Sequence, residues 1–530
     1  MRFSLIDASS IRSIEASRYT NSVTTFRGLN QNLAIGDGEW SDMKNMSDHL
    51  YPSIATRRPR GTSELTIASP KALMHKNGLF YIDGTKAYYK GTERFTVSDT
   101  DKLIVGMGAY IVVFPDGIMY NTFTNETEYM AASMNQSGTV TFAPLSSKSV
   151  YTKITATGIH NKFKKGDNVE ISGCTNSSYN GTHIITDAGT NFIVISGALS
   201  AQFTQASGLK FERKIPSLDF VCERDNRLWG CSTENHEVYC CKVGDPKNWY
   251  SYETGADMAW AATVGSDGDF TACTKFSTYC LFFKENTVHI LRGDKPSNFS
   301  LSEKALPGVR KGCSRSVLSI NDTLYYVGRN GIYSFDGAIP QKISDNIKGD
   351  ISDAVASQYE SKYYLSCKLD GVQKLIVYDP KTHIFDIEDD TEFKFADYSD
   401  GVLWYIGREN SLAKIYGDKD EVIDWFLEAD DLSAMSLDMK YVSKIKLNLW
   451  LKVNTEVNVS MKFDDDPMWY KKGYIRATKN KTYTIPINPM RCTKYCIRIE
   501  GKGQAIIMGM STQIEQGSEL NGSIQHQYIR

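Results

Sequence analysis

The sequence predicts an all-β protein: a β-propeller of about seven blades, with an inserted small β-domain and a C-terminal β-sandwich. The first observation is a hairpin motif that recurs along the middle of the chain, as in 77–84, 322–328 and 401–407. Each copy joins a Gly, Asn or Asp to aromatic and β-branched residues, a tight turn and a second apolar run. Such a unit cannot bury its own apolar face, so its repetition indicates a radial array of small sheets.

The spacing of these hairpins is the second observation. Most intervals between them lie near the roughly 40 to 50 residues of a four-stranded propeller blade. One interval, from Ile111 to Leu228, is longer by about 75 to 80 residues than a blade requires. The excess matches a segment with its own short strand-like runs, such as 151–157 and 192–195. We therefore expect a small β-barrel or sandwich inserted in a loop between two blades.

The flanking segments differ from the repeats. After about residue 417, segments such as 444–452 and 495–500 alternate strictly between apolar and polar residues, which is typical of half-buried strands. The segment before Asn77 has mixed polarity and little period, which favours an extended arm. The predicted organisation is an arm at 1–70, propeller at 71–134 and 216–421, an insert at 135–215 and a sandwich at 422–530.

Two turns provide the strongest internal repeat. Gly244–Trp249 and Gly293–Phe299 each follow a strand, contain Asp and Pro, and end in an aromatic residue. Asp and Pro favour a tight turn, and the aromatic side chain can then cover the core of its blade. The two turns lie about one blade period apart, which supports the propeller.

Composition excludes several functions. Lys and Arg number 60 against 62 Asp and Glu, so the net charge of −2 gives no support for broad attraction to nucleic acid or an anionic membrane. No run of about 18 apolar residues occurs, and the first ten residues lack the apolar core of a signal peptide. We expect a soluble chain without a membrane anchor, made in the cytoplasm. Its 11 cysteines are then expected to be reduced core residues.

Motifs for catalysis, cofactors or metals are not found. The sequence contains no GxSxG elbow, HExxH pair, paired CxxC or P-loop, so we predict no enzyme, no cofactor and no metal site. The acidic runs 388–390 and 464–466 are interpreted as solvated turns. Two alternatives stay open, namely calcium at 464–466 and glycosidase acids in either run.

The arm contains the candidate subunit contacts. Arg57-Arg-Pro-Arg60 is read either as a solvated loop before the first blade or as part of an arm that lies against a neighbouring subunit. In the second reading the contacts come from the arginines and from aromatic and aliphatic anchors. The candidates are Phe26, Arg27, Leu29, Trp40, Met43, Arg57, Arg58 and Arg60.

A family resemblance adds a function to this fold. The arm sequence from Phe26 to Ser47, followed by Tyr51 to Arg60, resembles the opening of tailed-bacteriophage stabilisation proteins. These are tail-hub proteins related to the β-propeller plug of short-tailed phages. The turn 244–249 and the runs 483–492, 499–503 and 514–518 are similar to sequences of phage-tail proteins.

The resemblance implies a structural protein of the virion tail, made in the host cytoplasm. It would form a homo-oligomer, expected to be a hexameric ring, below the portal and its adaptor. Its partners would be that adaptor and the distal tail proteins, with packaged DNA contacted only in the channel that the ring helps to close. Two alternatives are a receptor- or glycan-binding propeller at the tail tip and a glycosidase or depolymerase. The subunit count, the neighbours, the host and the role of the insert stay open.

Overall fold

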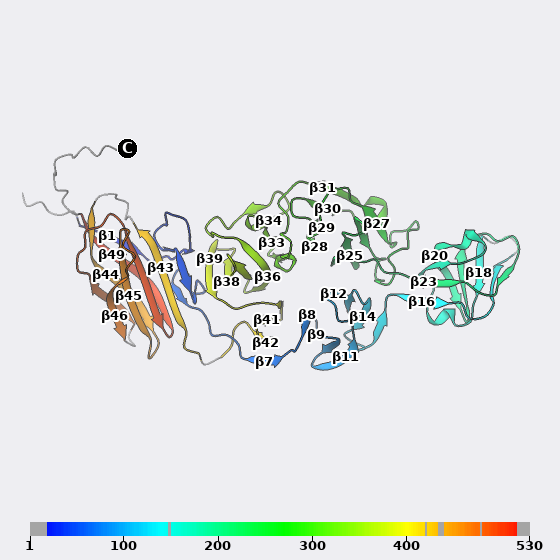
Figure 1. Ribbon diagram of the computed structural model, residues 1–530, viewed down its shortest axis with the longest axis horizontal. Coiled ribbons are helices and arrows are strands. Elements are labelled where there is room, and N and C mark those ends of the chain that lie inside the picture. The colour runs from blue at the N-terminus through cyan, green and yellow to red at the C-terminus, as the bar shows by residue number, and fades with distance from the viewer. Residues whose placement is uncertain (1–17, 147–149, 419–420, 433–438, 477–479, 517–530) are drawn as a thin grey trace, which may run out of the picture.

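The computed structural model describes residues 18–146, 150–418, 421–432, 439–476 and 480–516. The regular structure of its described residues is β-strand, apart from four short 3-10 helices, η2 (Ile159–Asn161), η3 (Ser177–Tyr179), η4 (Pro296–Asn298) and η5 (Ser314–Ser316). Figure 1 shows three parts in a row: a C-terminal body, a ring of small sheets and the insert. No helix among the described residues has the length and apolar character needed to cross a membrane. The all-β class is confirmed, and the arrangement is propeller-like.

The ring consists of four-stranded antiparallel sheets, and the described residues contain seven of them. The first sheet contains β8 (Pro70–His75), β9 (Leu79–Asp83), β10 (Lys86–Tyr89) and β11 (Thr92–Thr96). The second contains β12 (Leu103–Met107), β13 (Tyr110–Phe114), β14 (Ile118–Asn121) and β15 (Thr127–Tyr129). The third contains β24 (Phe220–Arg224), β25 (Arg227–Ser232), β26 (Glu237–Cys240) and β27 (Trp260–Thr263).

The next three sheets follow in chain order. They are β28 (Ala272–Phe276), β29 (Tyr279–Phe283), β30 (Val288–Arg292) and β31 (Ser300–Lys304); β32 (Leu318–Ile320), β33 (Thr323–Gly328), β34 (Gly331–Phe335) and β35 (Gln341–Lys342); and β36 (Ile351–Tyr359), β37 (Lys362–Leu369), β38 (Val372–Asp379) and β39 (Ile384–Asp389).

The last sheet closes the ring with strands from two distant parts of the chain. Its members are β40 (Phe395–Ser399), β41 (Val402–Ile406), β42 (Ser411–Lys414) and β7 (Ser63–Thr66). Strand β7 comes from the N-terminal side and pairs with β42, with Ser411 opposite Thr66. The first strand of each sheet is innermost: β8 contacts β12 and β40, β24 contacts β12 and β28, and β36 contacts β32, β40 and η5.

The hairpin turns have the residues that their geometry requires. Between β32 and β33, Asn321 and Asp322 have φ values of 48° and 60°. Asn and Asp tolerate this left-handed region better than other residues with a Cβ, and two such residues in succession suit a tight hairpin. The stretch Gly328–Gly331 is the turn that joins β33 to β34. The hairpin motif thus forms the middle of each sheet.

The insert is one eight-stranded sheet system with its own apolar core. It leaves the ring after β15 and returns before β24 (Figure 1). In sheet order its strands are β16 (Ala132–Asn135), β23 (Lys210–Arg213), β19 (Asn168–Ser172), β20 (Gly181–Gly189), β21 (Phe192–Ser196), β18 (Tyr151–Thr155), β17 (Val140–Pro144) and β22 (Phe203–Gln205).

The C-terminal body has two sheets that share an apolar core. One contains β47 (Lys481–Pro486), β44 (Lys440–Leu451), β49 (Ala505–Gln516), β6 (Ile54–Thr56), β5 (Met46–Ser47) and β1 (Arg18–Val23). The other contains β4 (Asp42–Lys44), β43 (Asp424–Leu432), β48 (Tyr495–Lys502), β45 (Glu456–Phe463) and β46 (Tyr470–Arg476). A short parallel pair, β2 (Gly28–Leu29) and β3 (Glu39–Trp40), completes the arm.

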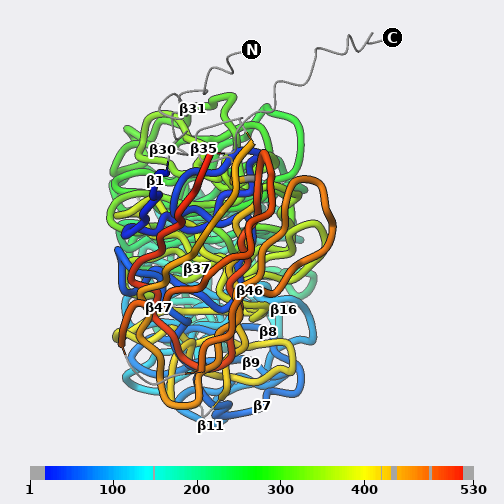
Figure 2. Tube along the Cα trace, turned by 90° about the vertical axis from the view of Figure 1, so that its left-hand side faces the viewer, coloured from blue at the N-terminus to red at the C-terminus, as the bar shows by residue number. Residues whose placement is uncertain are grey.

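The arm is therefore woven into the C-terminal body. Strand β1 pairs with β49, and in Figure 2 the blue arm lies beside the red last strand. Strand β4 pairs with β43, and β6 pairs with β49. The arm strands β2, β4 and β5 also contact β39, the outermost strand of a ring sheet. The arm thus connects the ring to the C-terminal body.

Candidate functional site

The innermost strands of the ring enclose a cavity of about 700 Å³, here called the central cavity. Its lining comes from the first strands β8, β12, β24, β28, β32, β36 and β40, together with η5. Many of the lining side chains are small, such as Ala72, Ala272, Ala354, Ala356 and Ala396. Seven strands converge here, and small side chains leave the space open. A volume of this size is typical of a site for a small ligand.

Most charged side chains in the lining already have partners. Lys102 is buried and bonds Asp116 at 2.5 Å. Lys394 donates to Asn410 Oδ1 at 2.7 Å. Asp397 accepts the backbone N–H groups of His75 and Tyr398, while burial raises the pKa of its carboxyl group.

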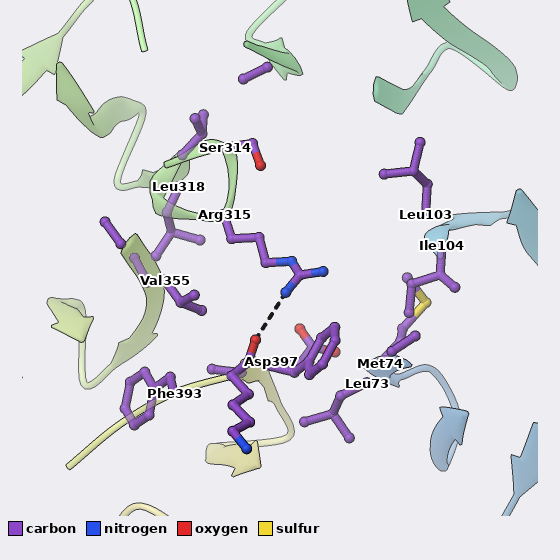
Figure 3. A pocket seen from close by; sticks show the side chains of 18 of the residues that line it. Leu73, Met74, Leu103, Ile104, Ser314, Arg315, Leu318, Val355, Phe393 and Asp397 are labelled. Carbon is purple, nitrogen blue, oxygen red and sulfur yellow. Dashed lines mark hydrogen bonds between the residues drawn. The ribbon is translucent and has the colours of Figure 1, made fainter. Parts of the chain in front are cut away.

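Arg315 differs from these residues. It lies on η5 and points across the central cavity toward β40, where Nη1 donates to the carbonyl oxygen of Lys394 at 3.1 Å (Figure 3). Its guanidinium carbon lies 4.1 Å from the centre of the Phe395 ring. No carboxylate among the described residues forms an ion pair with it.

This geometry suits an anionic ligand. A guanidinium group that lies over an aromatic ring and donates one hydrogen bond to a carbonyl oxygen leaves its other N–H donors for a ligand in the cavity. Leu73, Leu103 and Ile104 line the opposite side, which would exclude water from a bound ligand (Figure 3). The arrangement can bind a carboxylate or phosphate group. The described part of the chain has no cluster of three or more metal-ligating side chains.

The four apolar contact candidates of the arm are buried within this chain. Phe26, Leu29, Trp40 and Met43 are each 2% exposed or less. Phe26 stacks on Trp40 with ring centres 6.0 Å apart, and both belong to the core of the C-terminal body. Arg27 is exposed. A contact between the arm and a neighbouring subunit stays a prediction. Among the eight candidates, only Arg27 and the partly exposed Arg58 have side chains at the surface that could contact a neighbouring subunit.

The interpretation of Arg57–Arg60 as a solvated loop is wrong for two of its three arginines. Arg60 is 5% exposed, and its Nη2 lies 2.8 Å from Asp389 and 2.9 Å from Glu388. Arg57 is 7% exposed and bonds Glu421 at 2.8 Å. We call the set Arg57, Arg60, Glu388, Asp389, Tyr416 and Glu421 the arm joint.

The acidic run 388–390 is likewise not the solvated turn that was predicted. Glu388 is 0% exposed and accepts a hydrogen bond from Tyr416 Oη at 2.6 Å. Asp389 is 7% exposed. Burial alone would raise the pKa of Asp389, but Arg60 and Arg57 hold it below its usual value. These acids are buried because the arm supplies their counter-charges, which the local sequence around 388 does not reveal.

The other acidic run is a turn, as predicted. Asp465 has a side chain that is 95% exposed. Asp464 accepts from the backbone N–H groups of Thr493 and Lys494 at 2.8 and 3.1 Å. Asp466 accepts from Tyr470 Oη at 2.6 Å. The carboxylates at 464 and 466 therefore hold the local loop together.

The insert is attached to the ring by a second buried polar group. Asp167 lies 2.5 Å from Arg213, which also donates to the carbonyl oxygen of Met130. Asn248, at 0% exposure, accepts the Asn168 N–H at 2.8 Å and donates to Asp167 at 3.2 Å. Asn248 belongs to the turn 244–249, so this turn also connects the ring to the insert. We call Asp167, Arg213 and Asn248 the insert joint.

Comparison with known proteins gives only distant likenesses. No family model matches the chain, and no curated protein matches it. A computationally designed protein, Ika8, is similar at 10% identity and a TM-score of 0.32, over 68% of this chain and 98% of that one. BamB from Moraxella catarrhalis has 8% identity and a TM-score of 0.30, over 68% and 98%. The endosialidase of phage phi92 has 9% identity and a TM-score of 0.25, over 96% and 77%.

Proposed function

We propose that this chain is a structural protein of a tailed-bacteriophage virion, a ring-forming tail hub or stabilisation protein below the portal and its adaptor. In this proposal it is not an enzyme, and it helps to close the DNA exit channel. Its seven four-stranded sheets are the blades of a closed propeller, and its two C-terminal sheets form a β-sandwich. The observation that carries the proposal is the arm sequence at 26–47 and 51–60, with its resemblance to the opening of phage stabilisation proteins.

The position of the arm supports a structural role. Its strands complete both sheets of the C-terminal body, and its arginines pair with acids of the ring and of the segment that follows it. Buried, paired charges of this kind fix one part of a protein relative to another. An elongated subunit with a fixed relation between its parts suits a symmetric ring, in which each copy presents the same surfaces to its neighbours.

The size of the central cavity restricts where DNA could pass. About 700 Å³ is enough for a small ligand and not for a duplex that threads through the ring of sheets. In the proposed assembly, a DNA channel lies between subunits, around the symmetry axis of the hexamer. Contact with DNA would then come from the outer surface of the subunit.

The oligomeric state of the full-length protein tests the proposal. Native mass spectrometry should find six copies, and negative-stain images should show a six-fold ring. A monomer at all accessible concentrations, in the presence of the portal adaptor, would contradict it. Arg27→Glu and Leu33→Ser change exposed arm residues, and Leu33 is 96% exposed, so both variants should weaken assembly and leave folding unchanged. Leu145→Ser, at an exposed position of the insert, is the matched control.

A second function is favoured by Arg315. A receptor-binding propeller at the tail tip would use its guanidinium group to hold the carboxylate of an acidic sugar, with Phe395 fixing the orientation of the arginine. Titration with carboxylated and neutral monosaccharides distinguishes the two proposals. Binding of the acidic sugar alone, lost in Arg315→Ala, together with a trimer in place of a hexamer, would favour the tail-tip protein.

A further inference from the structure

Two thiols from neighbouring sheets lie in direct contact beside the central cavity. Cys222 is on β24 and Cys273 is on β28, the innermost strands of adjacent sheets. Their sulfur atoms are 3.1 Å apart. Both residues are partly exposed, whereas all nine other cysteines of the chain are buried. Cys273 lines the central cavity, so a small molecule in the cavity can reach it.

We propose that Cys222 and Cys273 are a site of oxidative modification, where a hydroperoxide or a small-molecule disulfide converts them into a disulfide that links two neighbouring sheets of the ring. A disulfide needs two Cβ atoms that approach closely, and sulfur atoms already in contact on adjacent strands meet that need with a small side-chain adjustment. The inference does not depend on the proposed tail function.

Oxidation of the two thiols by a hydroperoxide takes two steps. The sulfur of Cys273 attacks the peroxide, so an S–O bond forms and the O–O bond breaks, giving a sulfenic acid and one water or alcohol. The sulfur of Cys222 then attacks that sulfur, an S–S bond forms, and the S–O bond breaks with release of water. The two thiol protons leave in these products. The peroxide is reduced by the two electrons that the thiols lose.

A third thiol competes with this pairing. Cys280 on β29 also interacts with Cys222. Cys280 is 0% exposed and Cys273 faces the cavity, which favours Cys273 as the sulfur that meets the oxidant. The described residues hold no group of side chains with the geometry of a metal site, so metal binding is not the expected chemistry of these thiols.

The expected reaction is slow. Burial raises the pKa of Cys273 to about 12, and hydrogen bonding to Cys273 together with burial also raises the pKa of Cys222. Since the thiolate is the nucleophile, few molecules are reactive at neutral pH, and the rate should increase as the pH rises. Once formed, the bond would join residues 51 apart in the sequence and constrain the unfolded chain.

The tryptic map of this chain makes the test direct. Cys222 falls on peptide 215–224, Cys273 on 248–275 and Cys280 on 276–284, while the three cysteines between them share peptide 228–242. The full chain is reduced, freed of reductant and treated with hydrogen peroxide or oxidised glutathione. It is then alkylated in denaturant and digested without reduction. We expect mass spectrometry to find 215–224 joined to 248–275, with the loss of two hydrogen atoms.

Variants separate this result from a loss of folding. Cys222→Ser should abolish the linked peptide, and Cys280→Ser should leave it in place. The midpoint of thermal unfolding should rise on oxidation of the wild type and not of Cys222→Ser. The proposal is overturned if 215–224 is found joined to 276–284 instead. A second result would also overturn it. In that result, peptides 215–224 and 248–275 are both recovered in alkylated form after oxidation of the native chain, although the same oxidant links them in the unfolded chain.

Discussion

The arm joint and the central cavity both gather charged side chains, but they use them in opposite ways. In the arm joint, Arg57 and Arg60 are buried and each is paired with carboxylates. In the central cavity, Arg315 is accessible, and it contacts a carbonyl oxygen and an aromatic ring. Charges that are buried together stabilise one arrangement of the chain, whereas a cation with unused donors in a cavity is available to a ligand. The comparison therefore separates residues that hold the structure from a residue that can bind.

The largest change in the free energy of unfolding is expected from a substitution in the arm joint. Arg60→Ala removes the partner of Glu388 and Asp389 and leaves two buried carboxylates without their closest cation. We expect a loss of about 3 to 5 kcal/mol in the free energy of unfolding. Urea unfolding followed by fluorescence measures it.

Arg58→Ala is the matched control for that change. Arg58 pairs with Glu360, but the side chains are 35% and 50% exposed. Solvent screens such a pair, so the expected loss is about 0 to 1 kcal/mol. Equal losses for Arg58→Ala and Arg60→Ala would show that burial of the arm joint does not determine its contribution.

A smaller effect is expected at the insert joint. Asn248→Ala removes the acceptor for the Asn168 N–H and a donor to Asp167. Buried groups left without partners cost about 1 to 3 kcal/mol. Hydrogen exchange should increase first in the insert and in the turn 244–249. If exchange rises evenly over the whole chain instead, the turn does not act as the local attachment of the insert.

These two joints also show how far the sequence could predict the structure. The recurring hairpins predicted an all-β chain of small antiparallel sheets, because each hairpin is encoded by neighbouring residues. The arm could not be placed in this way. Its strand β6 pairs with β49, where Ile54 lies opposite Ile507, and no local pattern specifies a partner so distant in the sequence.

The site residues were harder to predict than the fold. Arg57 and Arg60 were selected from sequence, but their partners Glu388 and Asp389 were assigned to solvent because a run of acids gives no sign of a distant counter-charge. Arg315 carries no motif at all. Its position depends on the convergence of seven innermost strands, which becomes visible only when the ring is closed.

The effect of pH on the free energy of unfolding through His49 should be smaller than the effect of the substitutions in the arm joint and the insert joint. Burial, followed by the charge of Arg58, lowers the pKa of His49 near the arm joint below its ordinary value of 6.5. The folded chain then binds fewer protons than the unfolded chain as the pH falls through 6.5. This contribution to stability is therefore complete above that pH and is lost on acidification.

Urea unfolding at pH 7.5, 6.5 and 5.5 measures this effect on the wild type and on His49→Gln. We expect the free energy of unfolding to decrease less on acidification for the variant than for the wild type. A steeper decrease in His49→Gln would mean that the histidine takes up its proton more readily in the folded chain, contrary to the account.

The smallest effect on stability is expected in the central cavity. Arg315→Ala should change the free energy of unfolding by less than about 0.5 kcal/mol, since no buried carboxylate depends on it. Binding of a carboxylated ligand, followed by calorimetry, should be lost in the same variant. A large destabilisation by Arg315→Ala, comparable to that of Arg60→Ala, would place Arg315 among the structural charges and remove the contrast.

The central claim is that this chain is a subunit of the tail hub of a virion. Gold labelling of a tag fused to the chain, imaged by negative stain on purified virions, tests it most directly. The account predicts label at the junction of head and tail, around the tail axis. Label at the distal tips of fibres, or purified virions without label, would contradict it.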